Sequence, residues 1–226
     1  MKKELLAPNG KPSNLTAEQY KLVRTPEFKK WFGDWENDPK NASKVVDENG
    51  EPLVVYHGTG SDFNVFDKKK AHDTEGRKYG VGTGKGVFSF TKDLDNAEGW
   101  MERSKERSVY GVDSKNLKIL KVFLNFQNPT SRDDFESRLN EKFKGYSFRP
   151  QKERDKKIAE IYKEFKKEKI DGLISDFGEY TAFEPNQIKL ADGTNTTFDK
   201  NNNDIRFEKG GITDSGTPDY LKFLIG

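Results

Sequence analysis

The sequence predicts an α+β fold in which short strands outnumber helices. From residue 44 onward, short apolar runs alternate with polar or glycine-containing segments, which is typical of strands joined by short loops. Only 95–107 and 150–168 in this part have the longer periodicity of helices. The 226 residues are 35% charged yet include 17 Phe, 8 Tyr and 3 Trp, which indicates an aromatic core inside a hydrophilic shell.

The chain divides into three parts by its composition and its pattern of apolar residues. We expect a helical extension over 1–43, whose end at 37–43 resembles a linker, then a main domain over 44–208 and a tail or linker over 209–226. The length suffices for one large domain with its own core.

The extension is predicted to contain two helices. Thr16 followed three residues later by Gln19 forms a capping box, and Pro26 interrupts the first helix. Four aromatic side chains then recur at helical spacing: Phe28, Trp31, Phe32 and Trp35. They either dock on the main domain, which we favour, or form a helix that binds a partner.

The main domain begins with a predicted hairpin. The segments 44–46 and 52–56 flank an Asn-Gly pair, which is the signature of a tight turn between strands. Further strands are expected at 86–90, 118–124, 172–174 and 180–183, with a short closing strand at 205–207.

The helix at 150–168 is amphipathic. Its apolar residues Ile158, Ile161, Tyr162 and Phe165 fall on one face, and mixed charges cover the rest. That mixture suits a solvated face better than a nucleic-acid-binding stripe.

The composition excludes several kinds of site. A net charge of +2 gives no global field that argues for nucleic acid. The absence of cysteine excludes disulfides and thiolate metal sites, and two histidines leave little for zinc, so we expect no metal. The opening apolar run is too short for a signal peptide, and no 18-residue apolar stretch exists, so a soluble cytoplasmic protein that does not contact a membrane is expected.

The glycine cluster at 80–86 is not a phosphate-binding loop. A Walker motif needs glycine where Tyr79 stands and Ser or Thr where Gly86 stands, and the dinucleotide fingerprint is also out of register. The glycines instead precede a strand that contains Phe88. They would let the backbone approach a ligand, and aromatic side chains just behind could stack on a flat ring.

Three separated motifs follow one another along the chain: His57-Gly58-Thr59, Gly84-Lys85-Gly86-Val87-Phe88 and Gly178-Glu179-Tyr180. The ordered set resembles the ADP-ribosyltransferases of the His-Tyr-Glu type, which include the poly(ADP-ribose) polymerases and diphtheria toxin. With the leading Trp-Phe-Gly-Asp-Trp and the closing Phe-Glu-Pro-Asn-Gln-Ile-Lys, it looks most like the ADP-ribosyltransferase domains of large phage and mobile-element polyvalent proteins. The resemblance covers about residues 15 to 208.

The resemblance implies a split β-sandwich with flanking helices, in which NAD+ binds in a cleft between two small sheets. His57 would hydrogen-bond NAD+ on either its adenosine or its nicotinamide ribose side, and it is expected to belong to the catalytic residues. The Gly58 backbone would hold the carboxamide, where a Cβ would obstruct the approach, and Thr59 would add a hydroxyl contact.

The resemblance also assigns aromatic contacts to nicotinamide. Phe88 stands where the family has its stacking Tyr, and Trp100 stands near the second stacking Tyr. At both positions the aromatic ring is kept, but the hydroxyl group of the family's tyrosine is absent. Phe90, on the same strand face as Phe88, competes for the role.

Glu179 is the expected catalytic residue. Breaking the nicotinamide C–N bond builds positive charge on the ribose, which a carboxylate stabilises more in the transition state than in the ground state. Glu184 is the rival carboxylate. Because Phe177 stands two residues before Glu179, the E-x-E or Q-x-E pattern of arginine-modifying relatives is absent, and arginine is a less expected acceptor.

The segment 67–79 would form a flap over the donor site. Arg77, Lys78 or Lys85 would meet the NAD+ pyrophosphate.

The resemblance thus implies an NAD+-dependent mono-ADP-ribosyltransferase with a protein or nucleic-acid acceptor. It would act as a phage or mobile-element effector, or toxin, in the cytoplasm of a bacterial host, with an inhibitor or antitoxin as a candidate partner. The alternatives are an NAD+ glycohydrolase and a catalytically weak module that binds NAD+ or ADP-ribose.

Overall fold

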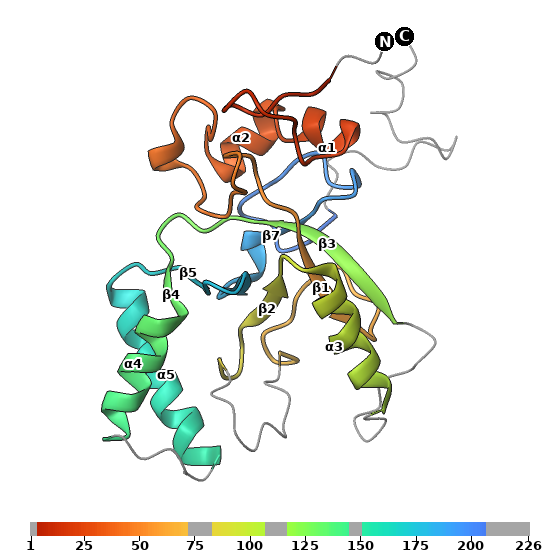
Figure 1. Cartoon of the computed structure of the whole chain (residues 1–226). Helices are drawn as coiled ribbons and strands as arrows, with labels where there is room; N and C mark the ends of the chain where they lie inside the picture. Colours follow the sequence, from red (N-terminus) through yellow and green to blue (C-terminus); the bar gives the residue numbers. More distant parts are fainter. Residues whose placement is uncertain (1–3, 72–82, 107–116, 145–150, 207–226) are drawn as a thin grey trace.

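A computed structural model describes residues 4–71, 83–106, 117–144 and 151–206 (Figure 1). The strands of its sheet are β1 (Val55–Thr59), β2 (Phe88–Thr91), β3 (Lys118–Leu124), β4 (Thr130–Ser131), β5 (Gly172–Ile174), β6 (Glu179–Ala182) and β7 (Ile188–Leu190). The α-helices are α1 (Ala17–Leu22), α2 (Pro26–Phe32), α3 (Leu94–Glu106), α4 (Arg132–Lys142) and α5 (Gln151–Lys167). The α+β prediction is confirmed.

The sheet consists of two halves that barely meet. The strand order is β4-β5-β6-β2-β1-β3-β7, and every pair is antiparallel except β4 with β5. β1 pairs with β3 along its full length, but its register with β2 contains one pair, Tyr56 with Thr91. The sheet therefore opens between β1 and β2, next to the histidine and glycine that follow Tyr56.

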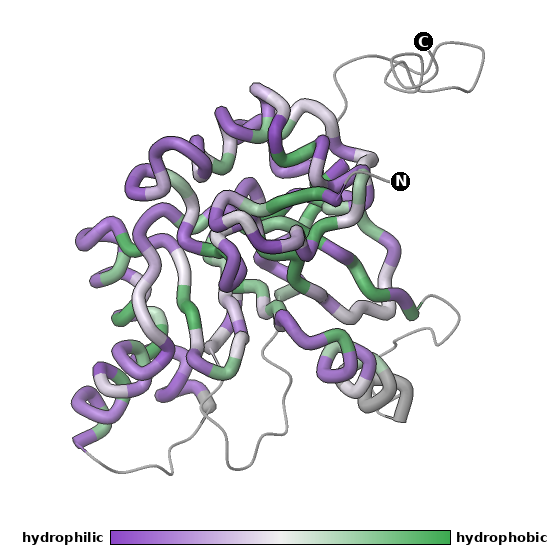
Figure 2. Tube along the Cα trace, turned by 45° about the horizontal axis from the view of Figure 1, so that its top comes forward, coloured by the Kyte–Doolittle hydropathy of each residue, from purple (hydrophilic) through white to green (hydrophobic). Residues whose placement is uncertain are grey.

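β3 has buried apolar side chains on both of its faces, because alternate side chains enter different cores. Leu120, Val122 and Leu124 join the central cluster with Phe88 and Phe90. Phe123 points to the opposite face. In Figure 2 the hydrophobic stretches lie mainly along the strands, and the outlying helices are mostly hydrophilic.

The N-terminal helices cover that opposite face. The predicted capping box between Thr16 and Gln19 is present, and Pro26 occupies the first turn of α2. All four predicted aromatic side chains of the extension are buried, and the Phe28 ring lies 5.1 Å from that of Phe123. These aromatics therefore dock on the sheet, as we favoured. The boundary at residue 43 stays a prediction.

Helices α4 and α5 pack side by side on the other half of the sheet (Figure 1). α5 matches the predicted 150–168, but α4 was not predicted. Ser131 caps α4 by accepting a hydrogen bond from the Asp134 amide, and Phe135 and Leu139 enter a core with Leu173 of β5.

Two predicted strands are wrong. The segment 44–46 contributes only an isolated bridge between Val46 and Pro52. Near 205–207, Asp204 forms an isolated bridge with Val65, and Ile205 donates its amide to the Asn64 carbonyl oxygen. Ile205 also accepts a hydrogen bond from the Leu190 amide at 2.9 Å, so the chain there lies between β7 and the loop after β1 without forming a strand. The tail after residue 206 lies outside the described residues.

Candidate active site

A cavity of about 430 Å³ lies where the sheet opens, within the range that is typical of small-molecule sites. Its walls come from β1, the loop after β1, β2 with the residues before it, β6, and the first turns of α3 and α4. Six of the predicted site residues line it: His57, Gly58, Thr59, Phe88, Phe90 and Glu179. Segments that are more than a hundred residues apart in sequence therefore converge on one cavity.

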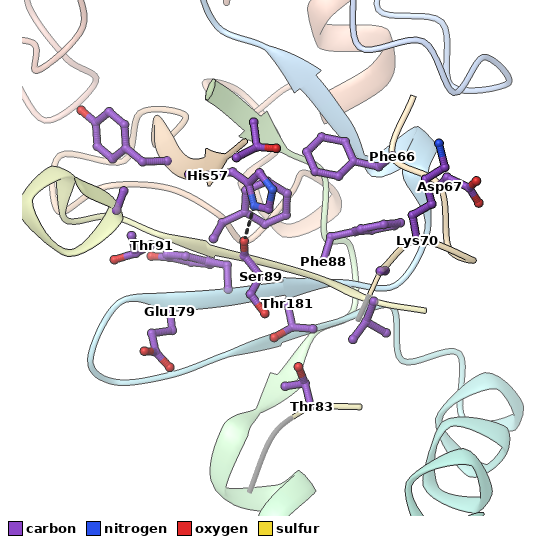
Figure 3. A pocket seen from close by; sticks show the side chains of 18 of the residues that line it. His57, Phe66, Asp67, Lys70, Thr83, Phe88, Ser89, Thr91, Glu179 and Thr181 are labelled. Carbon is purple, nitrogen blue, oxygen red and sulfur yellow. Dashed lines mark hydrogen bonds between the residues drawn. The ribbon is translucent and has the colours of Figure 1, made fainter. Parts of the chain in front are cut away.

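His57 has one ring nitrogen engaged. Its Nδ1 lies 2.8 Å from the backbone carbonyl oxygen of Ser89 (Figure 3). Since a carbonyl oxygen only accepts, Nδ1 carries the proton. Burial lowers the pKa of His57 below its ordinary value of 6.5, so the neutral ring prevails at pH 7. The neutral ring has a lone pair on Nε2, which can accept a hydrogen bond from a ligand hydroxyl.

Aromatic side chains fix the His57 ring. The ring centroid of Phe66 lies 5.1 Å from that of His57, and the ring centroid of Phe90 lies 5.3 Å from it. Phe66 also meets Phe88 at 5.1 Å, so both strand phenylalanines share one face of β2 and one aromatic cluster. The side chain of Trp100, on α3, lies outside the described residues.

Gly58 lacks a side chain for a structural reason. A Cβ built on Gly58 would lie 2.9 Å from the backbone oxygen of Ala97 on α3. The space that a Cβ at Gly58 would need is therefore occupied by helix α3. The sequence pattern alone could not separate this helix contact from the close ligand approach that we expected.

We expect Gly58→Ala to lower the free energy of unfolding by about 1–3 kcal/mol, because α3 must move away from β1 to admit the methyl group. The displacement should also weaken ligand binding, because Gly58 and Ala97 both line the cavity. Urea unfolding and a thermal-shift titration with NAD+ measure the two effects. An unchanged unfolding midpoint would contradict the close packing of helix and strand.

Glu179 is held by a hairpin turn between β5 and β6. Ser175 donates its amide to the Glu179 carbonyl oxygen at 2.8 Å, and Gly178 in the turn has φ of +77°. On β2, Thr91 is the register partner of Glu179. The Glu179 side chain is exposed, and Glu179 is among the residues that line the cavity (Figure 3). The hairpin therefore fixes the backbone while the carboxylate stays accessible.

Glu184 occupies a different environment. Its carboxylate lies 2.8 Å from the Lys68 ammonium, its backbone amide donates to Oε1 of Gln187 in the 3₁₀ turn Pro185–Gln187, and Glu184 does not line the cavity. Of the two candidate carboxylates, only Glu179 reaches the site.

The cations at the site differ from those predicted. The Lys85 ammonium lies 3.0 Å from the Asp155 carboxylate on α5, and Lys85 does not line the cavity. Arg77 and Lys78, with most of the predicted flap, lie outside the described residues. Lys70 and Arg132 do line the cavity.

Sequence reasoning missed Phe66 and Arg132, and it included Lys70 only as part of the predicted flap 67–79. A signal existed for Arg132, because Ser131-x-x-Asp with apolar residues at 135 and 139 marks a helix start. Phe66 follows Phe63 by three residues just after β1, but no pattern predicts that its ring packs against His57.

Metal sites and membrane-spanning helices can be assessed for the described part of the chain. It contains no group of three or more His, Asp or Glu side chains that could hold a metal ion. None of its helices has the length and apolar character needed to span a bilayer.

Comparison with known proteins identifies the family. The family model described as "ADP-Ribosyltransferase in polyvalent proteins" matches residues 47–198, which is more than half of the chain. No curated protein and no solved structure matches significantly. The match agrees with the resemblance inferred from the three motifs, and its range includes His57, Phe88 and Glu179. The chain therefore belongs to the family of ADP-ribosyltransferases found in polyvalent proteins.

Proposed function

We propose that the protein transfers a single ADP-ribose from NAD+ to a macromolecular acceptor and releases nicotinamide. The observation that carries the proposal is that His57 and the exposed Glu179 carboxylate line one cavity of about 430 Å³. The membership of the family supports the transfer of ADP-ribose in general.

In the proposed reaction, the bond between the nicotinamide nitrogen and ribose C1′ breaks, and its electron pair leaves with nicotinamide. Positive charge develops on the ribose, and the Glu179 carboxylate stabilises it. An acceptor nucleophile then forms a new bond to C1′ and loses its proton. Glu179 is the residue proposed to accept that proton.

The remaining residues are proposed to bind NAD+. Nε2 of His57 would accept a hydrogen bond from a ribose hydroxyl, because Nδ1 is engaged by Ser89. Lys70 and Arg132, which line the cavity, would face the pyrophosphate. Phe88 or Phe90 would contribute an aromatic face, with Trp100 as the second.

We further propose that the protein acts as an effector of a phage or mobile element in the cytoplasm of a bacterial host. The support is its membership of a family found in polyvalent proteins.

Nicotinamide release from NAD+, measured beside transfer of labelled ADP-ribose into a cell lysate, tests the proposal. Release together with label in macromolecules is the expected result. Release without label would identify an NAD+ glycohydrolase instead. Neither activity, with a melting temperature raised by NAD+, would identify a binding module.

The affinity for NAD+ should depend on pH through His57. Because burial lowers the pKa of His57 below 6.5, the ring stays neutral and accepting from pH 8 down to pH 6.5, and affinity should be constant there. Below that range the proton on Nε2 removes the acceptor, and affinity should fall. Calorimetric titration at several pH values measures this, and a decline that begins above pH 7 would contradict it.

A further inference from the structure

On helix α5 the most exposed charged side chains are lysines, whereas the sequence shows only a mixture of charges. The buried side consists of Ile158, Ile161 and Phe165. Among the described side chains of the helix, the exposed ones are Ala159 and five lysines: Lys152, Lys156, Lys163, Lys166 and Lys167. Four of these lysines are spaced by four, seven and four residues, so they follow one line along the helix. At 1.5 Å per residue, this lysine stripe (Lys152, Lys156, Lys163 and Lys167) is about 22 Å long.

Three of the four acidic residues of the helix lie beside the stripe, in ion pairs. Asp155 pairs with Lys85 at 3.0 Å, on the flank toward β2. Glu160 pairs with Lys157 at 3.2 Å, and Glu164 pairs with Lys142 of α4 at 2.7 Å, on the other flank. At 100° per residue, Asp155 and Glu164 lie about 60° outside the band of lysines, and Glu160 lies about 20° from its edge, where it interacts with Lys156. Within the described part of the chain, no ion pair neutralises the four stripe lysines.

The helix that carries the stripe forms a support of the cavity. The Tyr162 hydroxyl donates to the Thr83 carbonyl oxygen at 2.7 Å, and Thr83 lines the cavity. Gly84, also in the cavity wall, packs against Ile158, where a Cβ would lie 2.6 Å from a side-chain carbon. A polymer bound along the stripe therefore lies on an element in direct contact with the cavity wall.

We propose that the lysine stripe of α5 binds the phosphate backbone of a nucleic-acid acceptor. This inference rests on the proposed function and names its substrate class. A row of exposed cations along one face of a helix is complementary to a polymer with one negative charge per repeat. An acidic protein partner fits less well, because the stripe has no exposed aromatic or large apolar anchor and lysine is depleted at protein interfaces.

The test replaces the four stripe lysines by glutamine in the full chain. The matched control changes four exposed lysines of the N-terminal region, Lys11, Lys21, Lys30 and Lys40, so that both variants lose the same charge. Fluorescence anisotropy measures binding of labelled 20-nucleotide RNA, single-stranded DNA and duplex DNA at several salt concentrations. The three probes show which nucleic acid is preferred.

We expect the stripe variant to bind the preferred probe at least about tenfold more weakly, and its plot of log affinity against log salt to be less steep by about 3. The control should stay within about twofold of wild type. Label transfer to nucleic acid should fall in the stripe variant, whereas nicotinamide release without acceptor should not. Equal oligonucleotide binding by the wild type and the stripe variant, or label found only in protein, would overturn the inference. Failure of the proposed function is distinguishable, because nicotinamide release would then be absent in wild type while the binding assay still reports on the stripe.

Discussion

Glu179→Gln is expected to reduce nicotinamide release by about 10²–10³-fold while leaving NAD+ binding within about threefold of wild type. The amide keeps the size of the carboxylate but lacks the negative charge that stabilises the positive charge developing on the ribose. The fold should not change, because the backbone of Glu179 is held by the hairpin and its side chain is exposed. Initial rates by chromatography, with binding by calorimetry, measure the separation between turnover and affinity.

Glu184→Gln is the matched control for this change. Glu184 is exposed, lies five residues further along the chain and pairs with Lys68 away from the cavity. Its substitution should leave the rate within about twofold of wild type. If Glu184→Gln abolished release and Glu179→Gln did not, the assignment of the catalytic carboxylate would be reversed.

Local sequence predicted the elements whose apolar residues recur with the period of a strand or a helix and pack against a core. β3 matches the predicted 118–124, because its apolar residues fill cores on both faces. β5 matches 172–174, and α5 differs by one residue at each end from 150–168. The hairpin at 44–56 was only half correct. Its turn forms at Gly50, with φ of +81°, but the flanking segments share one bridge.

Site residues were predicted where they belong to a motif on a strand. They were missed where contacts between distant segments determine the position of the side chain. His57, Phe88 and Glu179 lie on strands that the sheet brings to one cavity. Lys85, beside the glycines, instead pairs with Asp155, because α5 packs against that segment. Phe66 reaches His57 only through the path of the loop after β1, which no periodicity records.

The path of that loop depends in part on a buried lysine. Lys189 of β7 is fully buried, and its ammonium donates to the carbonyl oxygens of Asn202 at 2.7 Å and Asp204 at 2.8 Å. Asp204 in turn bridges Val65, the neighbour of Phe66. Burial lowers the pKa of Lys189 to about 8, although the nearby carboxylates of Asp199 and Asp204 oppose this shift. The neutral amine still has two N–H donors, which suffice for the two carbonyl oxygens.

The lowered pKa of Lys189 predicts that stability rises with pH in a defined window. Below pH 8 the amine is protonated in both the folded and the unfolded state, so pH has no effect through this group. Between pH 8 and 10.5 the unfolded state binds more protons, so the free energy of unfolding should rise, by about 3 kcal/mol in total. Lys189→Met lacks this group and should lack the rise, whereas Lys121→Met, at an exposed position of β3, should retain it. Urea unfolding of the three proteins at pH 7.5, 9 and 10.5 measures the difference. If the free energy of unfolding changed with pH in the same way in wild type and Lys189→Met, Lys189 would have the same pKa in the folded and unfolded states. The hydrogen bonds to the surrounding backbone carbonyls would then offset the desolvation of its ammonium.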